Sequence, residues 1–198
     1  MAPRTGRSLL CAAFAAWIIV VGCGFSAVWA YAMTPGAAAT ASAHWPSASF
    51  SFDRTRPSLV TVLHPECVCS KATLEEVSRL TTEFADQLTV FVVVDASATG
   101  TDSGAATKLL KQVRGMPGVR LIVDHDGREV ERFGAKVSGQ TFFYDRDGRL
   151  QFSGGVTMSR GHVGPNAGTE AIRHVLQSKP AASTAAVFGC VLPRGGRG

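Results

Sequence analysis

The chain has 198 residues, of which 45% are hydrophobic and 18% are charged. The apolar fraction is too high for a disordered protein, and the length suits one ordinary domain with extra segments. The formal net charge of +5 would suit nucleic acid, but residues 34–193 hold 16 basic and 15 acidic residues, so the excess charge lies near the chain ends. Phosphate binding needs basic charge clustered on the folded domain, which excludes nucleic acid as a partner.

The first predicted element is an apolar helix at residues 9–33, which follows a short basic N-terminus at residues 1–8. Its 25 residues contain no charge, and as a helix they would span about 37 Å, enough to cross a hydrocarbon core of ~30 Å. Arg4 and Arg7 precede the helix, so the positive-inside rule places the N-terminus in the cytoplasm and the rest outside. We therefore predict a single-pass anchor in the inner or plasma membrane, with a domain that faces the periplasm or the cell exterior.

Two cleaved forms of this segment are alternatives to an uncleaved anchor. Residues 30–32 (Ala-Tyr-Ala) form a small-x-small site of the kind found in signal peptides. Residues 20–23 (Val-Val-Gly-Cys) resemble a lipoprotein processing box, with Cys23 as the lipidated residue. The apolar core is longer than the roughly 7–15 residues of a signal peptide, which favours the anchor. All three forms export the domain that follows.

An irregular segment rich in Ala, Ser and Pro follows at residues 34–57, and we interpret it as a linker. His44 and Trp45 lie within it and are interpreted as linker contacts. The folded domain is predicted at residues 58–178, and residues 179–198 form a C-terminal tail that carries Cys190.

The folded domain alternates predicted strands and helices. Short β-branched or apolar runs predict strands at 58–63, 88–95, 119–123, 141–144 and 150–152. Apolar residues spaced three and four apart predict helices around 74–88, 106–113, 130–133 and 172–176. The order β-α-β-α-β-α-β-β-α, in which parallel crossovers precede a hairpin and a closing helix, predicts an α/β sandwich with a mixed sheet.

Four loops are predicted in this domain, three of which could be taken for ion-binding sites. The Asp-x-Asp-Gly-Arg stretches at 124–128 and 145–149 lack the further acidic ligands of a calcium loop, so we interpret them as turns. A Ser, Thr, Gly and Asp run predicts a loop at 96–104. The glycine-rich segment 153–168 is interpreted as an adaptable surface loop, with anion binding aided by Arg160 as the alternative.

The most informative stretch is Cys67-Val68-Cys69-Ser70, which falls where the first predicted strand ends and the first helix begins. The partial positive charge of a helix N-terminus favours the thiolate over the thiol. The thiolate is the form of cysteine that attacks disulfides and binds soft metals. The placement therefore predicts a reactive thiol site.

This plan of strand, cysteine, helix, inserted strand and helix, hairpin and closing helix resembles the thioredoxin superfamily. The closest likeness is to its membrane-anchored TlpA/ResA branch, carried by residues 132–134 (Arg-Phe-Gly) and 141–150. The resemblance covers roughly residues 55–178. It implies a thioredoxin-like three-layer sandwich and thiol–disulfide exchange with exported thiol or disulfide proteins, without an organic cofactor.

A narrower likeness is to RedB-type thioredoxin-like proteins. It is carried by residues 64–70 (His-Pro-Glu-Cys-Val-Cys-Ser), 152–155 (Phe-Ser-Gly-Gly) and 160–162 (Arg-Gly-His). These segments frame the cysteines and part of the glycine-rich loop, and they mark His162 as a supporting residue.

Two departures from the superfamily pattern concern the site itself. Alignment of Cys67 with the attacking cysteine puts Ser70 at the resolving position and Cys69 between the two. The cis-proline of the superfamily should fall near Gly139, which Gln140 follows, and no proline is present there. Ser70, Gly139 and Gln140 are therefore predicted as supporting residues whose handling of substrate differs from that of the superfamily.

The resemblance implies that Cys67 attacks the substrate, and two cysteines are candidates to resolve the product. A Cys67–Cys69 disulfide would close a small, strained ring and would be oxidising. The other candidate is Cys190, in the apolar segment 187–192, which could fold back over the domain. The three exported cysteines are an odd number, so their pairing stays open.

Other functions compete with thiol–disulfide exchange. Cys67 and Cys69, with His64 or His162 as a third ligand, would suit a Cu(I)-binding or copper-delivery protein. A redox-silent binding module is a further alternative because both departures affect the site. A permanent disulfide that only staples the domain is less favoured, since stabilising disulfides usually close longer loops.

Overall fold

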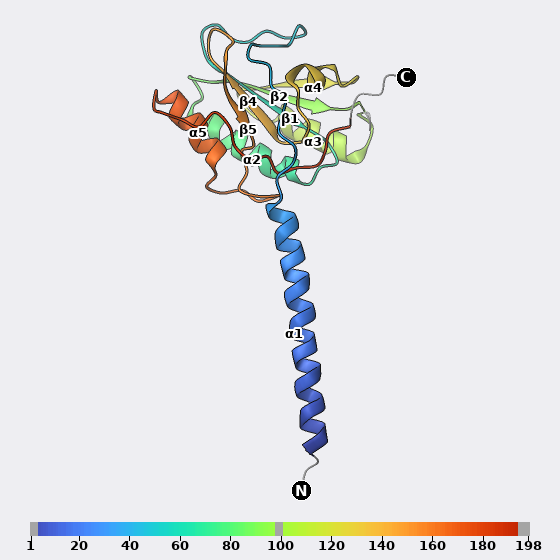
Figure 1. Ribbon diagram of the computed structural model, residues 1–198. Coiled ribbons are helices and arrows are strands. Elements are labelled where there is room, and N and C mark those ends of the chain that lie inside the picture. The colour runs from blue at the N-terminus through green and yellow to red at the C-terminus, as the bar shows by residue number, and fades with distance from the viewer. Residues whose placement is uncertain (1–3, 98–100, 194–198) are drawn as a thin grey trace. The chain divides into compact units, whose positions relative to one another are not determined.

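The computed structural model describes residues 4–97 and 101–193. Residues 98–100 of the predicted loop 96–104, the first three residues and the last five of the predicted tail lie outside this description. The chain divides into two compact units, Met1–Thr34 and Pro35–Gly198. The first unit holds helix α1 (Arg4–Met33), and the second holds every strand and the other helices (Figure 1).

Helix α1 contains the apolar segment predicted as an anchor. Its stretch Gly6–Met33 is long and apolar enough to cross a membrane. The side chains described along it are exposed in the chain alone, including large apolar ones such as Trp17 and Phe25. A helix with apolar residues on all sides is typical of a membrane span.

Five strands form one mixed sheet: β1 (Ser58–Leu63), β2 (Thr89–Asp95), β3 (Val119–Asp124), β4 (Gln140–Tyr144) and β5 (Leu150–Gly154). Their order across the sheet is β3-β2-β1-β4-β5. The pairs β1–β2 and β2–β3 are parallel, whereas β4 is antiparallel to both β1 and β5. This is the predicted arrangement of parallel crossovers followed by a hairpin, and it is a thioredoxin-like α/β fold.

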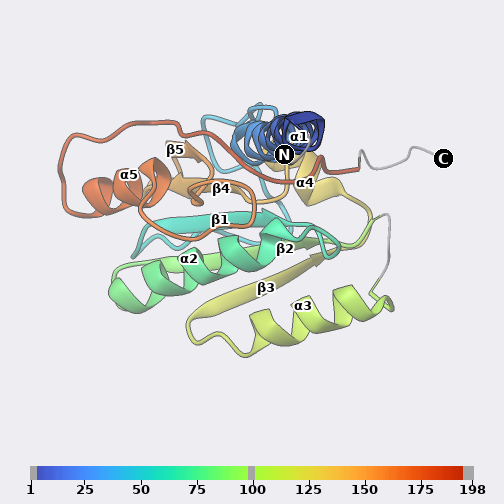
Figure 2. The ribbon, with the colours of Figure 1, turned by 90° about the horizontal axis from the view of Figure 1, so that it is seen from below.

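Four helices accompany the sheet: α2 (Cys69–Glu83), α3 (Gly104–Arg114), α4 (Arg128–Phe133) and α5 (Ala167–Leu176). Figure 2 shows α2 lying along the strands and α3 beside β3. Apolar residues of α2, α3 and α5 pack on one face of the sheet, and those of α4 pack on the other. The three predicted layers are therefore present.

The alternation of side chains along β1 explains why both faces are covered. Leu59 and Leu63 point into the core beneath α2, whereas Val60 and Val62 point to the side of α4. Every residue of β1 is buried, as expected of a central strand with structure on both sides. The end of this strand, which leads directly into the cysteines, is consequently held in place from both faces.

The segment interpreted as a linker packs against the α4 face of the sheet. The Trp45 ring lies 5.4 Å from the Phe50 ring, 5.5 Å from that of Phe133 and 5.2 Å from that of Tyr144. Its indole N–H donates to the carbonyl of Phe50 at 3.1 Å, and the neighbouring His44 forms an isolated β-bridge with Arg149. This part of residues 34–57 therefore forms part of the second unit.

The C-terminal segment after α5 folds back across the domain, and we name its residues 183–192 the tail strand. The N–H of Ser153 in β5 donates to the carbonyl of Ser183 at 2.9 Å. The N–H of Gly36 donates to the carbonyl of Val187 at 2.8 Å. The tail strand thus lies between the glycine-rich end of β5 and the start of the second unit.

The two Asp-x-Asp-Gly-Arg stretches form turns, as predicted. Gly127 and Gly148 adopt positive φ angles of 74° and 73°, which a glycine adopts without strain. An oxygen of Asp145 accepts the N–H groups of Asp147 and Arg149, both at 2.9 Å. The carboxylate oxygens are therefore used within the turn.

Candidate functional site

The site begins where β1 ends and the chain turns into α2. The N–H of Cys67 donates to the carbonyl of His64 at 3.2 Å, and the N–H of Ser70 donates to the carbonyl of Cys67 at 3.0 Å. Helix α2 begins at Cys69 and is preceded by Val68 as its N-cap residue. Cys67 therefore lies immediately before the helix, at the predicted junction.

Three of the five cysteines gather at this junction as free thiols. Cys67 is 4% exposed and Cys69 is 2% exposed, whereas Cys190 is half-buried. The backbone N–H of Cys190 donates to the Cys67 sulfur, with 3.3 Å between N and Sγ. The thiols of Cys69 and Cys190 also hydrogen-bond to the Cys67 sulfur. The structure thus brings together all three predicted redox cysteines.

These contacts make one of the three thiols more acidic than an ordinary cysteine and the other two less acidic. The hydrogen bond from the Cys69 thiol, which outweighs the effect of burial, lowers the pKa of Cys67 to about 4. The bond to Cys67 and burial raise the pKa of Cys69 well above its usual range. Burial and the contact with Cys67 raise the pKa of Cys190 to about 11. At neutral pH the cluster therefore holds one thiolate, on Cys67, between two thiols.

Ser70, which was predicted as a supporting residue, makes structural hydrogen bonds. Its hydroxyl donates to the carbonyl of His64 at 2.8 Å. The Ser138 hydroxyl lies 3.1 Å from Ser70 Oγ and accepts the N–H of His64 at 2.9 Å. Ser70 and Ser138 therefore fasten the turn that carries Cys67 to the loop before β4.

The loop before β4 contains Gly139, the position at which a cis-proline was expected. No peptide bond among the described residues is cis. Gly139 adopts a φ of 91°, and its N–H donates to the carbonyl of Val62 at 2.8 Å. A Cβ at Gly139 would lie 2.9 Å from the Thr73 hydroxyl of α2. Gly139 thus brings this loop close to the helix that carries the cysteines, whereas the Gln140 side chain bonds to Ser153 of β5.

The two histidines proposed as copper ligands make local contacts. Nδ1 of His64 accepts the N–H of Glu66 at 3.3 Å. Nδ1 of His162 lies 2.7 Å from the carbonyl oxygen of Arg160 and 3.2 Å from Oγ of Ser159. Across residues 4–97 and 101–193, no group of three or more His, Cys, Asp or Glu side chains is arranged to hold a metal ion. Among the described residues, neither histidine is therefore grouped with Cys67 and Cys69 as a third ligand.

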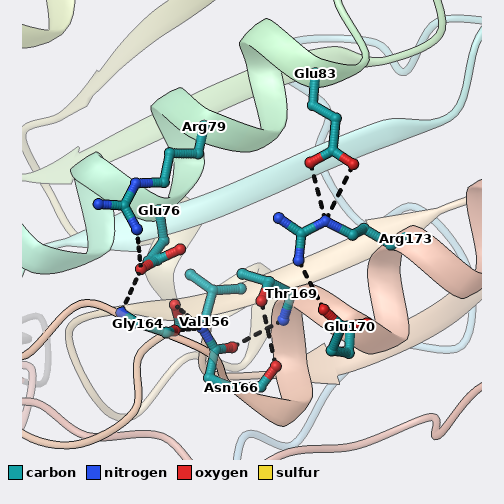
Figure 3. A network of polar contacts seen from close by, with 9 residues as sticks. All are labelled: Glu76, Arg79, Glu83, Val156, Gly164, Asn166, Thr169, Glu170 and Arg173. Carbon is teal, nitrogen blue, oxygen red and sulfur yellow. Dashed lines mark hydrogen bonds and ion pairs between the residues drawn. The ribbon is translucent and has the colours of Figure 1, made fainter.

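The glycine-rich loop is held against α2 by a polar network (Figure 3). Glu76 of α2 is buried, and its carboxylate accepts the N–H of Gly164 at 2.7 Å and pairs with Arg79. Asn166 caps α5 by accepting the N–H of Thr169 at 2.8 Å, and its amide N–H donates to the carbonyl of Val156 at 3.1 Å. Both ends of the loop are therefore fixed.

The middle of that loop reaches the cysteines. The backbone of Gly161 hydrogen-bonds to the Cys69 side chain. The Arg160 guanidinium donates to the carbonyl of Gly189 in the tail strand, and its charge lowers the pKa of Cys190. The sequence indicates Arg160 as an anion ligand and as part of the RedB-type segment 160–162, but it does not single out Ser138 or Glu76. The apolar periodicity of α2 does not predict that Glu76 is buried, because the glycine-rich loop, and not the sheet, covers its face of the helix.

No protein-family model matches the chain, and no curated protein sequence matches it. Among solved structures, the chain is similar to a hypothetical protein from Sinorhizobium meliloti, with 21% identity, a TM-score of 0.58, and 80% of this chain and 93% of that chain covered. It is also similar to an uncharacterized conserved protein from Geobacillus kaustophilus, with 17% identity, a TM-score of 0.57 and coverage of 80% and 91%. These likenesses show a shared fold.

A more distant likeness is to the exposed lipoprotein thioredoxin Etrx1 of Streptococcus pneumoniae, with 21% identity, a TM-score of 0.47, and 63% of this chain and 86% of that chain covered. By its strand order, the chain has a thioredoxin-like α/β fold, and a thiol cluster lies at the junction of β1 and α2.

Proposed function

We propose that this protein is a membrane-anchored thiol–disulfide oxidoreductase that acts on exported proteins through its Cys-x-Cys motif. The observation that carries the proposal is the Cys67 sulfur, which has a pKa of about 4 and contacts two other thiols. A thiolate is the form of cysteine that attacks disulfides. Exchange also needs a second sulfur within reach, and Cys69 and Cys190 both meet this need.

The proposed location follows from α1 and from the charges before it. The helix is long and apolar enough to cross a membrane, and the basic residues at its N-terminal end favour a cytoplasmic start. The domain then lies in the periplasm or at the cell exterior, where protein disulfides persist. The segments 64–70 and 160–162, which resemble RedB-type proteins, both border the thiol cluster, and this supports placing the chain nearest to that type.

The proposed reaction starts with attack by the Cys67 thiolate on one sulfur of a substrate disulfide. A mixed disulfide forms between Cys67 and the substrate, and the other substrate sulfur leaves as a thiolate that takes a proton from water. Cys69 or Cys190 then attacks the Cys67 sulfur and releases the rest of the substrate. The partners are exported thiol or disulfide proteins, and the residues of the cluster supply the chemistry without an organic cofactor.

The test is the reaction of the reduced full-length chain, in detergent, with an aromatic disulfide whose thiolate product is coloured. We expect the native chain to react faster than free cysteine at neutral pH and Cys67→Ser to lose this fast phase. Cys23→Ser, which removes an exposed cysteine of α1, is the matched control and should react normally. A native chain no faster than free cysteine would contradict the proposal and favour a redox-silent binding module.

A further inference from the structure

The tail strand pairs with the loop before β4 directly beside Cys67. The N–H of Ser138 donates to the carbonyl of Cys190 at 2.8 Å, and the N–H of Leu192 donates to the carbonyl of Lys136 at 2.9 Å. Between these two bonds, Val137 and Val191 form an antiparallel bridge. The pairing is made by main-chain groups, so it does not depend on the side chains of the segment that occupies this place.

Glycines let the tail strand approach the domain closely. A Cβ at Gly189 would overlap the carbonyl oxygen of Ser138. Along β5 and just after it, a Cβ at Gly154 would lie 2.5 Å from the N of Ala185, and one at Gly155 would lie 2.5 Å from the O of Ala186. Gly154 and Gly155 therefore form a narrow seat for an extended segment, which is a use of the glycine-rich stretch that composition alone did not indicate.

The tail strand in this seat is only partly buried. Val187, Phe188 and Leu192 are buried, whereas Val191 is 79% exposed and Cys190 is half-buried. The strand therefore has apolar side chains that hold it down and, at Cys190, a sulfur that faces Cys67. An extended segment with a cysteine at this register would present its sulfur to Cys67 in the same way.

We propose that the tail strand occupies the place of a cysteine-bearing segment of a protein substrate, that the substrate displaces it, and that its return brings Cys190 to resolve the mixed disulfide. This inference rests on the proposed function and names one of the two candidate sulfurs as the resolving one. It also gives the substrate a class, an extended polypeptide segment that pairs through its main chain.

The return step is a thiol–disulfide exchange between Cys190 and the mixed disulfide at Cys67. Cys190 gives its thiol proton to solvent, and its sulfur attacks the Cys67 sulfur of the mixed disulfide. A Cys67–Cys190 bond forms, the bond between Cys67 and the substrate breaks, and the substrate sulfur leaves as a thiolate that is protonated. The substrate disulfide is thereby reduced to two thiols while Cys67 and Cys190 are oxidised to one disulfide, which an external dithiol must reduce before the next cycle.

The charges around Cys190 favour this step once Cys67 has attacked the substrate. The negative charge of Cys67 is one cause of the high pKa of Cys190, and this charge disappears when Cys67 enters a mixed disulfide. The positive charge of Arg160, which lowers the pKa of Cys190, remains. The thiolate form of Cys190 thus becomes more accessible once Cys67 has reacted with substrate.

The first experiment tests displacement. Two probes carry the same aromatic leaving group, one on a free small disulfide and one on the central cysteine of an extended peptide, and both react with the reduced full-length chain in detergent. Gly189→Ala should loosen the tail strand and raise the ratio of the peptide rate to the small-disulfide rate about fivefold, the effect of one lost hydrogen bond. Val191→Ala, at the exposed neighbouring position, should leave the ratio unchanged.

A second pair of variants separates the loss of a main-chain hydrogen bond from general damage to the fold. Leu192→Pro and Leu192→Ala both remove the buried side chain, but only the proline also removes the N–H that bonds to Lys136. The proline variant should have the higher peptide ratio of the two. The proposed displacement would be overturned if the two variants of each pair had the same ratio of peptide rate to small-disulfide rate while Cys67 still reacted normally with the small disulfide.

The second experiment tests the return. After reaction with the peptide probe, mass spectrometry should find a Cys67–Cys190 disulfide and free peptide in the native chain and in Cys69→Ser. The peptide should remain attached to Cys67 in Cys190→Ser. Attachment that persists in Cys69→Ser but not in Cys190→Ser would overturn the role of Cys190. A chain in which Cys67 reacts with neither probe would contradict the proposed function itself, which separates the two failures.

Discussion

At Cys67, the largest cause of acidity is a neighbouring thiol. The hydrogen bond from the Cys69 thiol is the largest cause of the low pKa of Cys67, and it outweighs the cost of burying the charge. The Cys-x-Cys spacing makes this possible, because one intervening residue lets both side chains turn inward while Val68, 82% exposed, points outward. The motif therefore supplies its own activating group.

This cause predicts outcomes of different size for two substitutions at one position. Cys69→Ala removes the hydrogen-bond donor and should raise the pKa of Cys67, because the thiolate loses its main stabilising contact. Cys69→Ser keeps a hydroxyl donor and should raise the pKa less. The ultraviolet absorbance of the thiolate, followed against pH, measures both. A pKa of Cys67 that is the same in the native chain and in Cys69→Ala would show that another group is responsible.

The low pKa of Cys67 also predicts how exchange depends on pH. A group with its pKa lowered to about 4 is already deprotonated at neutral pH, so its rate of attack on a small disulfide should stay nearly constant between about pH 6 and pH 8. The rate should fall only as the pH drops through the pKa of Cys67, where the thiolate gains a proton. A rate that rises about tenfold per pH unit in the neutral range would instead indicate an ordinary thiol.

The sequence predicts part of this site and not the rest for a clear physical reason. The position of Cys67 and Cys69 at a strand-to-helix junction follows from local patterns, and the structure places them there. The contact with Cys190 joins residues 123 positions apart, and the fastening role of Ser138 depends on a loop that no periodicity describes. Such contacts arise from tertiary folding alone.

Among the elements, the segment around Trp45 contributes more than its composition suggests. It covers the α4 face of the sheet, where strand β2 would otherwise expose Phe91. It has no regular secondary structure, so it carries no apolar period that would identify it as a packed element. The strands were predicted close to their observed bounds, whereas α2 and α5 begin five residues before their predicted starts, because their first turns carry no apolar periodicity.

Trp45 is therefore expected to stabilise the second unit. Trp45→Ala should lower the free energy of unfolding by about 3 kcal/mol, at the low end for a large aromatic because the ring is only partly buried. Trp45→Phe should lower it less, since a ring remains among the aromatic neighbours. His44→Ala, at the exposed adjacent position, is the matched control and should have little effect. Denaturant unfolding followed by circular dichroism measures all three, and equal stability of Trp45→Ala and the native chain would refute the role of the ring.

At the scale of the whole molecule, the chain consists of an apolar helix and a domain with its own core. The order of elements and the mixed sheet could be predicted from the sequence, because crossover and hairpin connections restrict the arrangements open to this pattern. The sequence allowed the apolar segment 187–192 to fold back over the domain, but its pairing with the loop before β4 could not be predicted, since main-chain pairing of an irregular segment leaves no periodic pattern.

This division predicts that the domain folds without α1. A chain that begins at Thr34 should remain in solution without detergent, because the exposed apolar side chains of α1 are removed. Its thermal unfolding midpoint should match that of the full-length chain in detergent, measured by circular dichroism. A lower midpoint for the shortened chain would mean that α1 contributes to the stability of the domain.

The gathering of three sulfurs has a consequence for resistance to oxidation. A thiolate as acidic as Cys67 is also the group that peroxides oxidise first, and a sulfenic acid left alone proceeds to irreversible sulfinic and sulfonic acids. With Cys69 and Cys190 in contact with it, a sulfenic acid at Cys67 condenses with a thiol at once, and the lesion is stored as a bond that reductants can undo.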